Sequence, residues 1–274
     1  MSLFGHAEAL TKHWKDCSDI SFETLKQWER RCIEAGMKSK TEKLVPLVAE
    51  SRLKEWLQTQ SPFISIVQEE LSQLTGRIAT PHFFIMADRE GIVIHVEGRP
   101  KILRDIRHYG VQEGTSFSLE HAGINGISAS MQTHSLFVVQ GFEHTLQMFR
   151  DWSCICMPIY QDNEIVAYLD LTLRTGSNLC FPVALLEKAV HVIEAKWQAS
   201  NPQSRRTQIY ADFEQFGLTA REKEVAYGWL HNQSALQMST VMNITEGTVR
   251  NLLKKVYVKT KVSDKGQFMR KFLA

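Results

Sequence analysis

Residues 218–274 are divided into short blocks of helical apolar spacing, and each block follows a capping residue. Thr219 with Glu222 three positions later matches a capping box, and Ser234 and Thr245 are further N-cap candidates. The predicted apolar faces are Val225, Ala226, Trp229 and Leu230 in the first block, Leu236, Met238, Val241 and Met242 in the second, and Val249, Leu252, Leu253, Val256 and Tyr257 in the third. Capped amphipathic blocks of this length predict a small all-α domain.

The third block has two chemically different sides. The side opposite its apolar residues presents Arg250, Asn251, Lys254, Lys255 and Lys259. A helix that packs by one side and offers Arg, Asn and Lys on the other suits the major groove of DNA. A plain solvated charged face is the simpler interpretation for an isolated helix. After Glu246, however, Asp264 is the only acidic residue, and this shortage favours a DNA partner.

The net charge also separates the end of the chain from the rest. Residues 201–274 contain 12 Lys and Arg against 6 Asp and Glu, whereas residues 1–200 contain 20 against 24. The overall charge of +2 hides this difference. A basic module joined to an acidic one predicts a polyanion-binding end attached to a domain with another task.

Three segments at this end resemble the LuxR/FixJ-type helix-turn-helix domain: LTAREKEV (218–225), ITEGTVRNLLKKVYVKTKV (244–262) and the closing helix after Ser263. The resemblance covers residues 218–274 and implies a four-helix DNA-binding fold. It implies that Arg250, Asn251 and Lys254 face base edges. It places at phosphates Thr248, Lys255, Lys259, Lys261 and the backbone at Thr245 and Glu246. Residues 232–239 depart from the family pattern, so phosphate contacts of the second helix are not carried over.

Residues 1–200 predict an α+β domain with a mainly antiparallel sheet. Residues 82–96 and the pair 153–160 and 165–173 have the composition of β-hairpins with short polar turns. Residues 41–78 have mainly helical spacing. A further amphipathic helix is predicted directly after Pro182. Its apolar face consists of Val183, Leu186, Val190, Ile193 and Trp197.

The expected domain boundaries follow from these patterns. Residues 1–40 form an N-terminal helical segment, 41–199 the α+β domain with its flanking helices, 200–216 a linker and 217–274 the all-α domain. The linker prediction depends on residues 200–206, which contain turn formers and charges without apolar anchors.

Several function classes lack their sequence signatures. Residues 1–200 contain no phosphate-binding loop, kinase motif or G-x-S-x-G, so we expect no enzyme. The five cysteines are odd in number and widely spaced, which fits reduced thiols in the cytoplasm. We also expect no membrane span and no secretory signal, since there is no apolar run of about 18 residues and no apolar core near the N-terminus.

Cys154 and Cys156 are the clearest candidates for special chemistry. They alternate with Ile155, so on a strand both thiols face the same side, and Glu143 and His144 lie about ten residues upstream. Such a set could bind haem or a transition metal, or sense redox state. The plainer interpretation is that free cysteines are core residues, because this pattern is far short of a four-ligand zinc site. We therefore assign no metal site.

Five motifs, in this order, resemble the N-terminal GAF-type sensor domain of activators of acetoin and glycerol catabolism. They are Trp28-x-x-Arg31-Cys32 with Gly36, then residues 114–131, 140–144, 152–159 and 168–171. The resemblance implies an antiparallel sheet flanked by helices, with a small-molecule pocket lined by Phe83, Asn125, Glu143, His144, Trp152, Cys154 and Cys156. For Trp152, plain core packing is an equal alternative. Those activators continue into an ATPase that this chain lacks, so their activation mechanism is not carried over.

The sequence therefore predicts a cytoplasmic transcription regulator whose GAF-like domain binds a small organic effector. The expected partners are double-stranded DNA, the effector and a second copy of the chain, with RNA polymerase a possible addition. The helices at 41–78 and 183–199 are the expected dimer surfaces. One alternative is a redox, haem or metal sensor that uses Cys154, Cys156 and His144. Another is an N-terminal protein-interaction module.

Overall fold

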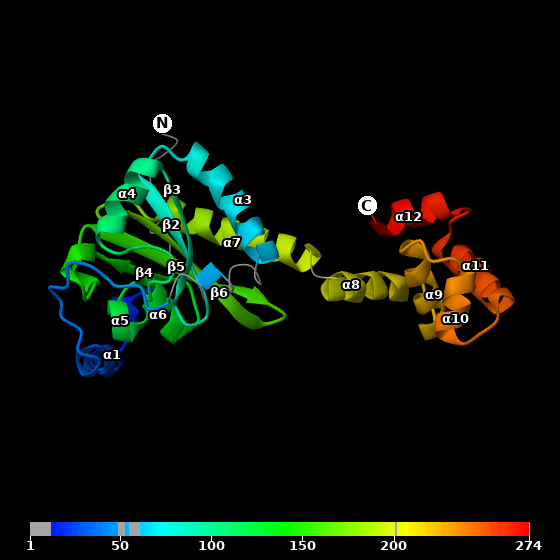
Figure 1. Ribbon diagram of the computed structural model, residues 1–274, viewed down its shortest axis with the longest axis horizontal. Helices are drawn as coiled ribbons and strands as arrows, with labels where there is room; N and C mark the ends of the chain where they lie inside the picture. Colours follow the sequence, from blue (N-terminus) through cyan, green and yellow to red (C-terminus); the bar gives the residue numbers. More distant parts are fainter. Residues whose placement is uncertain (1–11, 49–52, 55–60, 201, 274) are drawn as a thin grey trace, which may run out of the picture. The chain divides into compact units, whose positions relative to one another are not determined.

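The computed structural model describes residues 12–48, 53–54, 61–200 and 202–273. The chain forms two compact units, Met1–Trp197 and Gln198–Ala274, whose elements are labelled in Figure 1. No helix in the described ranges combines the length and the apolar character that crossing a bilayer requires.

A six-stranded sheet forms the centre of the first unit (Figure 1). Its order is β1-β4-β5-β6-β2-β3. The strands are β1 (Lys15–Asp16), β2 (His82–Ala87), β3 (Val93–Gly98), β4 (Phe137–Gln140), β5 (Trp152–Gln161) and β6 (Glu164–Arg174). The pair β1–β4 is parallel and the other pairs are antiparallel. The predicted α+β class and both predicted hairpins, β2–β3 and β5–β6, are confirmed.

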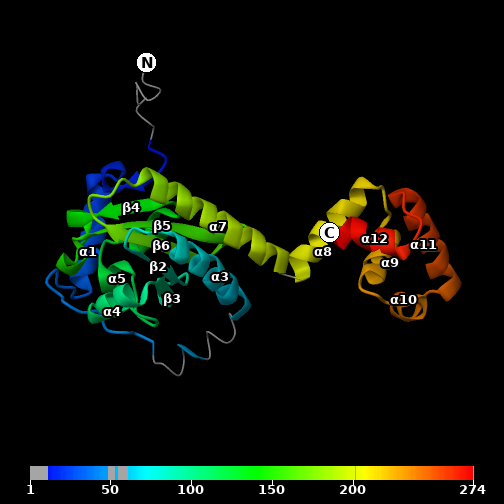
Figure 2. The same ribbon diagram turned by 90° about the horizontal axis from the view of Figure 1, so that it is seen from above.

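Two long helices, α3 (Ser61–Arg77) and α7 (Cys180–Ser200), cover one face of the sheet (Figure 2). The predicted helix behind Pro182 is confirmed, because α7 buries Val183, Leu186, Val190 and Ile193. These side chains share one apolar core with α3 and with the strand residues Phe84 and Leu171. These four apolar residues of α7 therefore form its buried face, and Trp197 packs against the same core while partly exposed.

Shorter elements cover the opposite face. They are η1 (Cys17–Asp19), α1 (Phe22–Glu34), α4 (Pro100–His108), α5 (Leu119–Ala122), α6 (Gly126–Thr133), η2 (Gly141–Glu143) and η3 (Gln147–Phe149). Phe83 and Ile85 of β2 pack with Ile106 of α4 and Phe149 on this face. Within the expected N-terminal segment 1–40, α1 is the helix; residues 1–11 lie outside the described ranges.

The prediction that residues 41–78 are mainly helical is wrong for 41–48, which contain no helix. The backbone N–H groups of Leu44 and Leu47 donate instead to the carbonyl oxygens of Tyr109 and Gly114, at 2.9 Å each. Pro46 has no N–H to contribute to a helix. Residues 49–52 and 55–60 of this stretch lie outside the described ranges.

The second unit is helical, as predicted for residues 217–274. Its helices are α8 (Pro202–Gln215), α9 (Ala220–Leu230), α10 (Ala235–Met242), α11 (Glu246–Thr260) and α12 (Lys265–Leu273). The linker prediction for 200–216 is wrong over 202–215, because α8 is a packed helix. Its Ile209 and Phe213, one turn apart, are buried in a core with Leu218 and Phe268.

The predicted buried face of α10 is also wrong in part. Leu236 and Val241 are 63% and 80% exposed, whereas Ala235, Met238 and Ser239 are buried. The buried set has helical spacing of three and four residues, and Met238 packs in a core with residues of α9 and α11. Leu236 and Val241 are apolar side chains, but they lie on the exposed side of α10 and do not contribute to its buried face.

Candidate functional site

Helix α11 presents the polar face that its sequence predicted. Thr245 caps the helix, accepting a hydrogen bond from the N–H of Thr248 at 3.1 Å. One side buries Val249, Leu253, Val256 and Thr260. The exposed side carries Thr248, Arg250, Asn251, Lys254 and Lys255. The residues that could read base edges and those that could contact phosphates therefore lie on a solvent-facing surface.

Arg250 makes a local ion pair on this surface. Its Nη2 and Nε lie 2.5 Å and 3.1 Å from Oε1 of Glu246, one helical turn earlier. The Arg250 side chain is 68% exposed, and exposed pairs of this spacing contribute only about 0.3–0.5 kcal/mol. Glu246 therefore orients the guanidinium group. Breaking this weak ion pair, so that Arg250 could bond another acceptor, costs little free energy.

Lys259 is engaged inside the second unit. Its Nζ donates to Oε2 of Glu222 at 2.7 Å and to the carbonyl oxygen of Gly217 at 2.9 Å. Burial alone would raise the pKa of Glu222, but hydrogen bonds from Lys259 and Thr219 hold that pKa below its ordinary value. Lys259 therefore supplies the countercharge of a buried carboxylate inside this unit. Lys261 remains exposed, at the C-cap of α11.

In the first unit, aromatic rings gather on the face covered by α4 and α6. Phe149 stacks on Trp152 with ring centroids 4.6 Å apart, and on Phe117 with centroids 5.8 Å apart. Phe83 meets Trp152 edge to face at 5.2 Å. The His144 ring lies 6.2 Å from that of Phe149. Phe149 thus contacts the rings of Phe117, His144 and Trp152.

Two cavities adjoin this cluster. An open cleft of about 310 Å³ is lined by Phe83, Ile106, Tyr109, Trp152 and Thr172, among others. Behind it lies a closed cavity of about 10 Å³, which is close to the minimum for one water molecule. Trp152 and Thr172 line both cavities. The two cavities therefore adjoin at these two residues.

A chain of buried polar groups runs beside the closed cavity. Nε2 of His144 lies 3.3 Å from Sγ of Cys154, which lies 3.5 Å from Oγ1 of Thr172. Thr172 donates to Oδ1 of Asp170 at 2.6 Å. Oδ2 of Asp170 has no hydrogen-bond partner among the described residues. A buried carboxyl group with one unmet oxygen therefore adjoins a cavity of water-molecule size.

Burial sets the protonation of this chain. It raises the pKa of Asp170 to about 7 and lowers that of His144 to about 4. It also raises the pKa of Cys154 and Cys156 well above the ordinary value. Nδ1 of His144 lies 3.1 Å from the carbonyl oxygen of Gly141, so it is the nitrogen that donates. At neutral pH, His144 is uncharged and its Nε2 accepts from the Cys154 thiol.

The other predicted pocket residues lie elsewhere or are already engaged. Glu143 accepts from the N–H of Gln140 at 2.7 Å and lines neither cavity. Cys156 also lines neither cavity and is fully buried in the core. Asn125 lines the closed cavity, but its side chain caps α6 and donates to the carbonyl oxygens of Phe117 and Gly123. Glu143, Cys156 and His144 thus line neither cavity, and His144 is linked to the closed one only through its contact with Cys154.

Phe149, Thr172 and Asp170 are functional-site candidates that the sequence did not predict. Asp170 belongs to a motif that carried the resemblance, but its position beside the closed cavity depends on strand pairing. Cys154 lies opposite Thr172 in the β5–β6 register, and that pairing creates the polar chain. No local pattern predicts this register.

The thiol and imidazole groups are not arranged as a metal site. No group of three His, Cys, Asp or Glu side chains in the described ranges could hold a metal ion. Both strand thiols are buried and protonated, and thiolate is the form that binds metals and reacts. The prediction that both thiols face the same side of the sheet is confirmed by their positions on β5.

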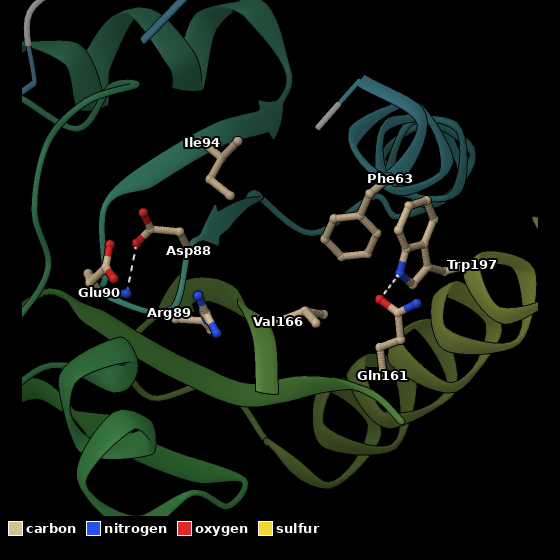
Figure 3. A pocket seen from close by; sticks show the side chains of 8 residues that line it. All are labelled: Phe63, Asp88, Arg89, Glu90, Ile94, Gln161, Val166 and Trp197. Carbon is tan, nitrogen blue, oxygen red and sulfur yellow. Dashed lines mark hydrogen bonds between the residues drawn. The ribbon is translucent and has the colours of Figure 1, made fainter. Parts of the chain in front are cut away.

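Figure 3 shows another cavity, of about 260 Å³, on the face covered by α3 and α7. Phe63, Ile94 and Val166 give it apolar walls, and Trp197 donates through Nε1 to Oε1 of Gln161 at 2.6 Å. The indole N–H is thus taken up within the protein, and the charged side chains of the lining come from the turn at Asp88, Arg89 and Glu90.

The chain matches no model of a known protein family. It is similar to a signal-transduction and transcriptional-control protein of Clostridium beijerinckii, with 24% identity over 190 residues, or 69% of this chain and 30% of that protein. It is similar to the acetoin dehydrogenase operon transcriptional activator AcoR of Bacillus subtilis, with 22% identity over 144 residues, or 52% of this chain and 24% of the activator. The chain thus spans less than a third of the length of either regulator.

The fold also has a counterpart among solved structures. A chain in the crystal structure of the E. coli DhaR(N)–DhaL complex matches with a TM-score of 0.57 at 14% identity, over 62% of this chain and 58% of that chain. The mixed α/β arrangement is therefore a known one. The curated relatives agree with the motif resemblance in that both are transcriptional regulators.

Proposed function

We propose that this chain is a transcription regulator in which a small effector, bound by a GAF-like domain, controls DNA binding by a LuxR-type helix-turn-helix domain. The observation that carries the proposal is the two-sided character of α11. One side is buried, and the other exposes Arg250, Asn251, Lys254 and Lys255. The similarity to transcriptional regulators supports the same class.

The exposed residues take different roles in this proposal. Arg250, Asn251 and Lys254 read base edges in the major groove. Thr248, Lys255, Lys261 and the N–H groups at Thr245 and Glu246 contact phosphates. The carboxylate of Glu246 orients Arg250 until the guanidinium reaches a base.

The effector binds in the cleft at Trp152. The cleft volume of about 310 Å³ is at the small end of the usual range, about 300–1,000 Å³, so the effector is a small molecule. Phe83, Trp152 and Tyr109 offer aromatic surfaces. Movement of Trp152 would join the cleft to the closed cavity and give the effector access to Asp170.

The effect of the bound effector reaches the DNA-binding domain through α7, because this helix is followed in the sequence by the second unit. An effector changes DNA binding only if its affinity differs between two packings of this helix. We propose a homodimer with two DNA half-sites about one helical turn apart. The outward faces of α3 and α7 are the proposed dimer surfaces, because their inner faces already pack on the sheet.

A thiol-based sensor is less well supported. Cys154 is buried and hydrogen-bonded to a neutral imidazole, and Cys156 is buried in the core. Neither thiol has the exposed, electropositive surroundings that lower a thiol pKa.

The DNA part is tested by selecting bound sequences from a random double-stranded pool with the full chain. We expect enrichment of two half-sites separated by about 10–10.5 base pairs. The enriched duplex should bind about 10³-fold or more tightly than a scrambled one. Recovery of the unselected pool would overturn the proposal.

The effector part is tested by screening neutral fragments for thermal stabilisation of the full chain. Trp152→Ala, which removes a wall of the cleft, should abolish binding of the hits that alter affinity for the enriched duplex. Hits that change DNA affinity equally in wild type and Trp152→Ala would contradict the cleft assignment.

A further inference from the structure

The cavity of Figure 3 lies apart from the cleft at Trp152. Its apolar walls belong to, or pack against, the core on the α3 and α7 face of the sheet. Among the described residues, it shares no lining residue with the cleft at Trp152 or with the closed cavity. An occupant of this cavity would therefore contact a different set of side chains from an effector in the cleft.

The polar part of the lining is the tight turn between β2 and β3, where Asp88 is half-buried and Arg89 and Glu90 are exposed. Oδ1 of Asp88 accepts from the N–H groups of Glu90 and Ile92, at 2.9 Å and 2.8 Å, and these bonds hold the turn. Within the described ranges, Oδ2 has no hydrogen-bond partner, and it is not one of the enclosed polar atoms. The turn thus presents an accessible carboxylate oxygen at the wall of the cavity.

Both signs of charge are present on this turn. The side chains of Arg89 and Glu90 form no ion pair with any described residue. Burial and the charge of Glu90 raise the pKa of Asp88, and backbone hydrogen bonds with the charge of Arg89 oppose that rise. One guanidinium and two carboxylates, carried by three consecutive residues, are therefore available at one end of the cavity.

The rest of the cavity is apolar and partly aromatic. The rings of Phe63 and Trp197 lie 5.1 Å apart and are tilted by 52°. Trp197 is partly exposed and its Nε1 is engaged by Gln161, so it offers the cavity a ring surface. The volume of about 260 Å³ is below the usual range for drug-sized ligands. The cavity therefore suits a small molecule with one apolar and one charged end.

We propose that this cavity binds a small zwitterion with an apolar body, the chemical class of free apolar amino acids. Its ammonium group bonds Oδ2 of Asp88, and its carboxylate pairs with the guanidinium of Arg89. The apolar body packs against Phe63 and Trp197. A ligand of one sign is disfavoured, because a cation would lie beside Arg89 and an anion beside two carboxylates. The ligand also contacts α7 near its C-terminal end, at Trp197.

L-Leucine tests this proposal together with two analogues, isopentylamine, which lacks the carboxylate, and isocaproate, which lacks the ammonium group. Each is titrated into the ¹⁵N-labelled full chain while the indole N–H resonances are followed by NMR. Leucine should shift the resonance of Trp197, identified with Trp197→Phe, and leave that of Trp152 unchanged. Each analogue should bind about fivefold more weakly, because it loses one ion pair. No leucine binding, equal affinities of the three probes, or a shift at Trp152 in place of Trp197 would overturn the proposal.

Arg89→Gln tests the carboxylate partner without disturbing the core, because Arg89 is exposed. Leucine affinity should fall about fivefold. Affinity for isopentylamine should stay the same or rise, since a like charge has been removed. Arg107→Gln is the matched control, an exposed arginine of α4 that lines neither this cavity nor the cleft. Unchanged leucine affinity in Arg89→Gln, or an equal loss in both variants, would contradict the pairing of Arg89 with the ligand.

Discussion

Nζ of Lys259 on α11 lies 2.7 Å from the carboxylate of Glu222 on α9, and this ion pair joins two helices of the second unit. The Glu222 side chain is 4% exposed, whereas that of Lys259 is 34% exposed. Removing the lysine would therefore leave a buried carboxylate without its countercharge. The residue that the sequence placed at a phosphate is thus a structural partner of the scaffold helix.

Lys259→Ala should lower the free energy of unfolding of the second unit by about 1–3 kcal/mol, because a buried acceptor loses its donor. Denaturant titration followed by circular dichroism measures this. The matched control is Lys255→Ala, which removes the same charge from an exposed position on the same helix. Lys255→Ala should leave stability unchanged, lower affinity for all duplexes, and reduce the salt slope by about one unit. If Lys259→Ala instead lowered DNA affinity and its salt slope without lowering stability, Lys259 would be a phosphate contact.

Arg250→Ala should relax discrimination at one base pair, with a loss of about 1–3 kcal/mol on the preferred duplex. The physical reason is that a guanidinium can bond a guanine edge in two places, and Glu246 holds it on the exposed side of α11. Competition titrations with single-base variants of the enriched duplex measure the effect. Equal losses on preferred and scrambled duplexes would contradict the base-contact role.

Asp170→Asn should remove a pH dependence of stability. Because the folded pKa of Asp170 is raised to about 7, the wild-type carboxyl favours folding below its unfolded value, and this contribution is lost as pH rises toward about 7. The variant should therefore be more stable than wild type at pH 8, by about 2–4 kcal/mol, and similar to it near pH 4. Thermal unfolding across this pH range measures both. Parallel curves for the two proteins would contradict the burial of the acid.

His144 should act in the opposite direction. Its folded pKa is lowered to about 4, so its contribution is present above the unfolded pKa and is lost as pH falls from about 6.5 to 4. In Asp170→Asn, the stability curve should consequently rise with pH over this window. Adding His144→Gln should flatten it, and a slope that persists in the double variant would assign the dependence to another group.

Gly126→Ala should destabilise the first unit by about 1–3 kcal/mol. A Cβ at this position would lie 2.5 Å from Oδ2 of Asp170 and 2.8 Å from Cβ of Cys154, both on buried strands. Gly76→Ala is the control, since a Cβ there meets nothing within 4 Å and the residue lies in α3. That change should leave stability the same or raise it slightly. A tolerated alanine at 126 would show that α6 can move away from β5 and β6.

Local chemistry in the sequence predicted the elements that have strong periodicity or clear turn signals. The capping residues Thr219, Ser234 and Thr245 each cap a helix, and both hairpins form with the predicted pairing partners. The predictions failed where apolar residues alone did not show which side of a helix is buried, or whether a segment is helical at all. Leu236 and Val241 lie on the exposed side of α10, and residues 41–48 take their hydrogen bonds from distant loops.

The sequence by itself determined that the chain has an α+β part and a basic helical part, and that α11 has one buried and one polar side. These properties follow from interactions within a few residues, such as caps, turns and helical spacing. Only the tertiary structure decided that Lys259 pairs with Glu222, that Asp170 adjoins the cavity beside Cys154, and that Asp88 and Trp197 line the same cavity. Those relationships depend on strand register and helix packing, which bring together residues that no local pattern connects.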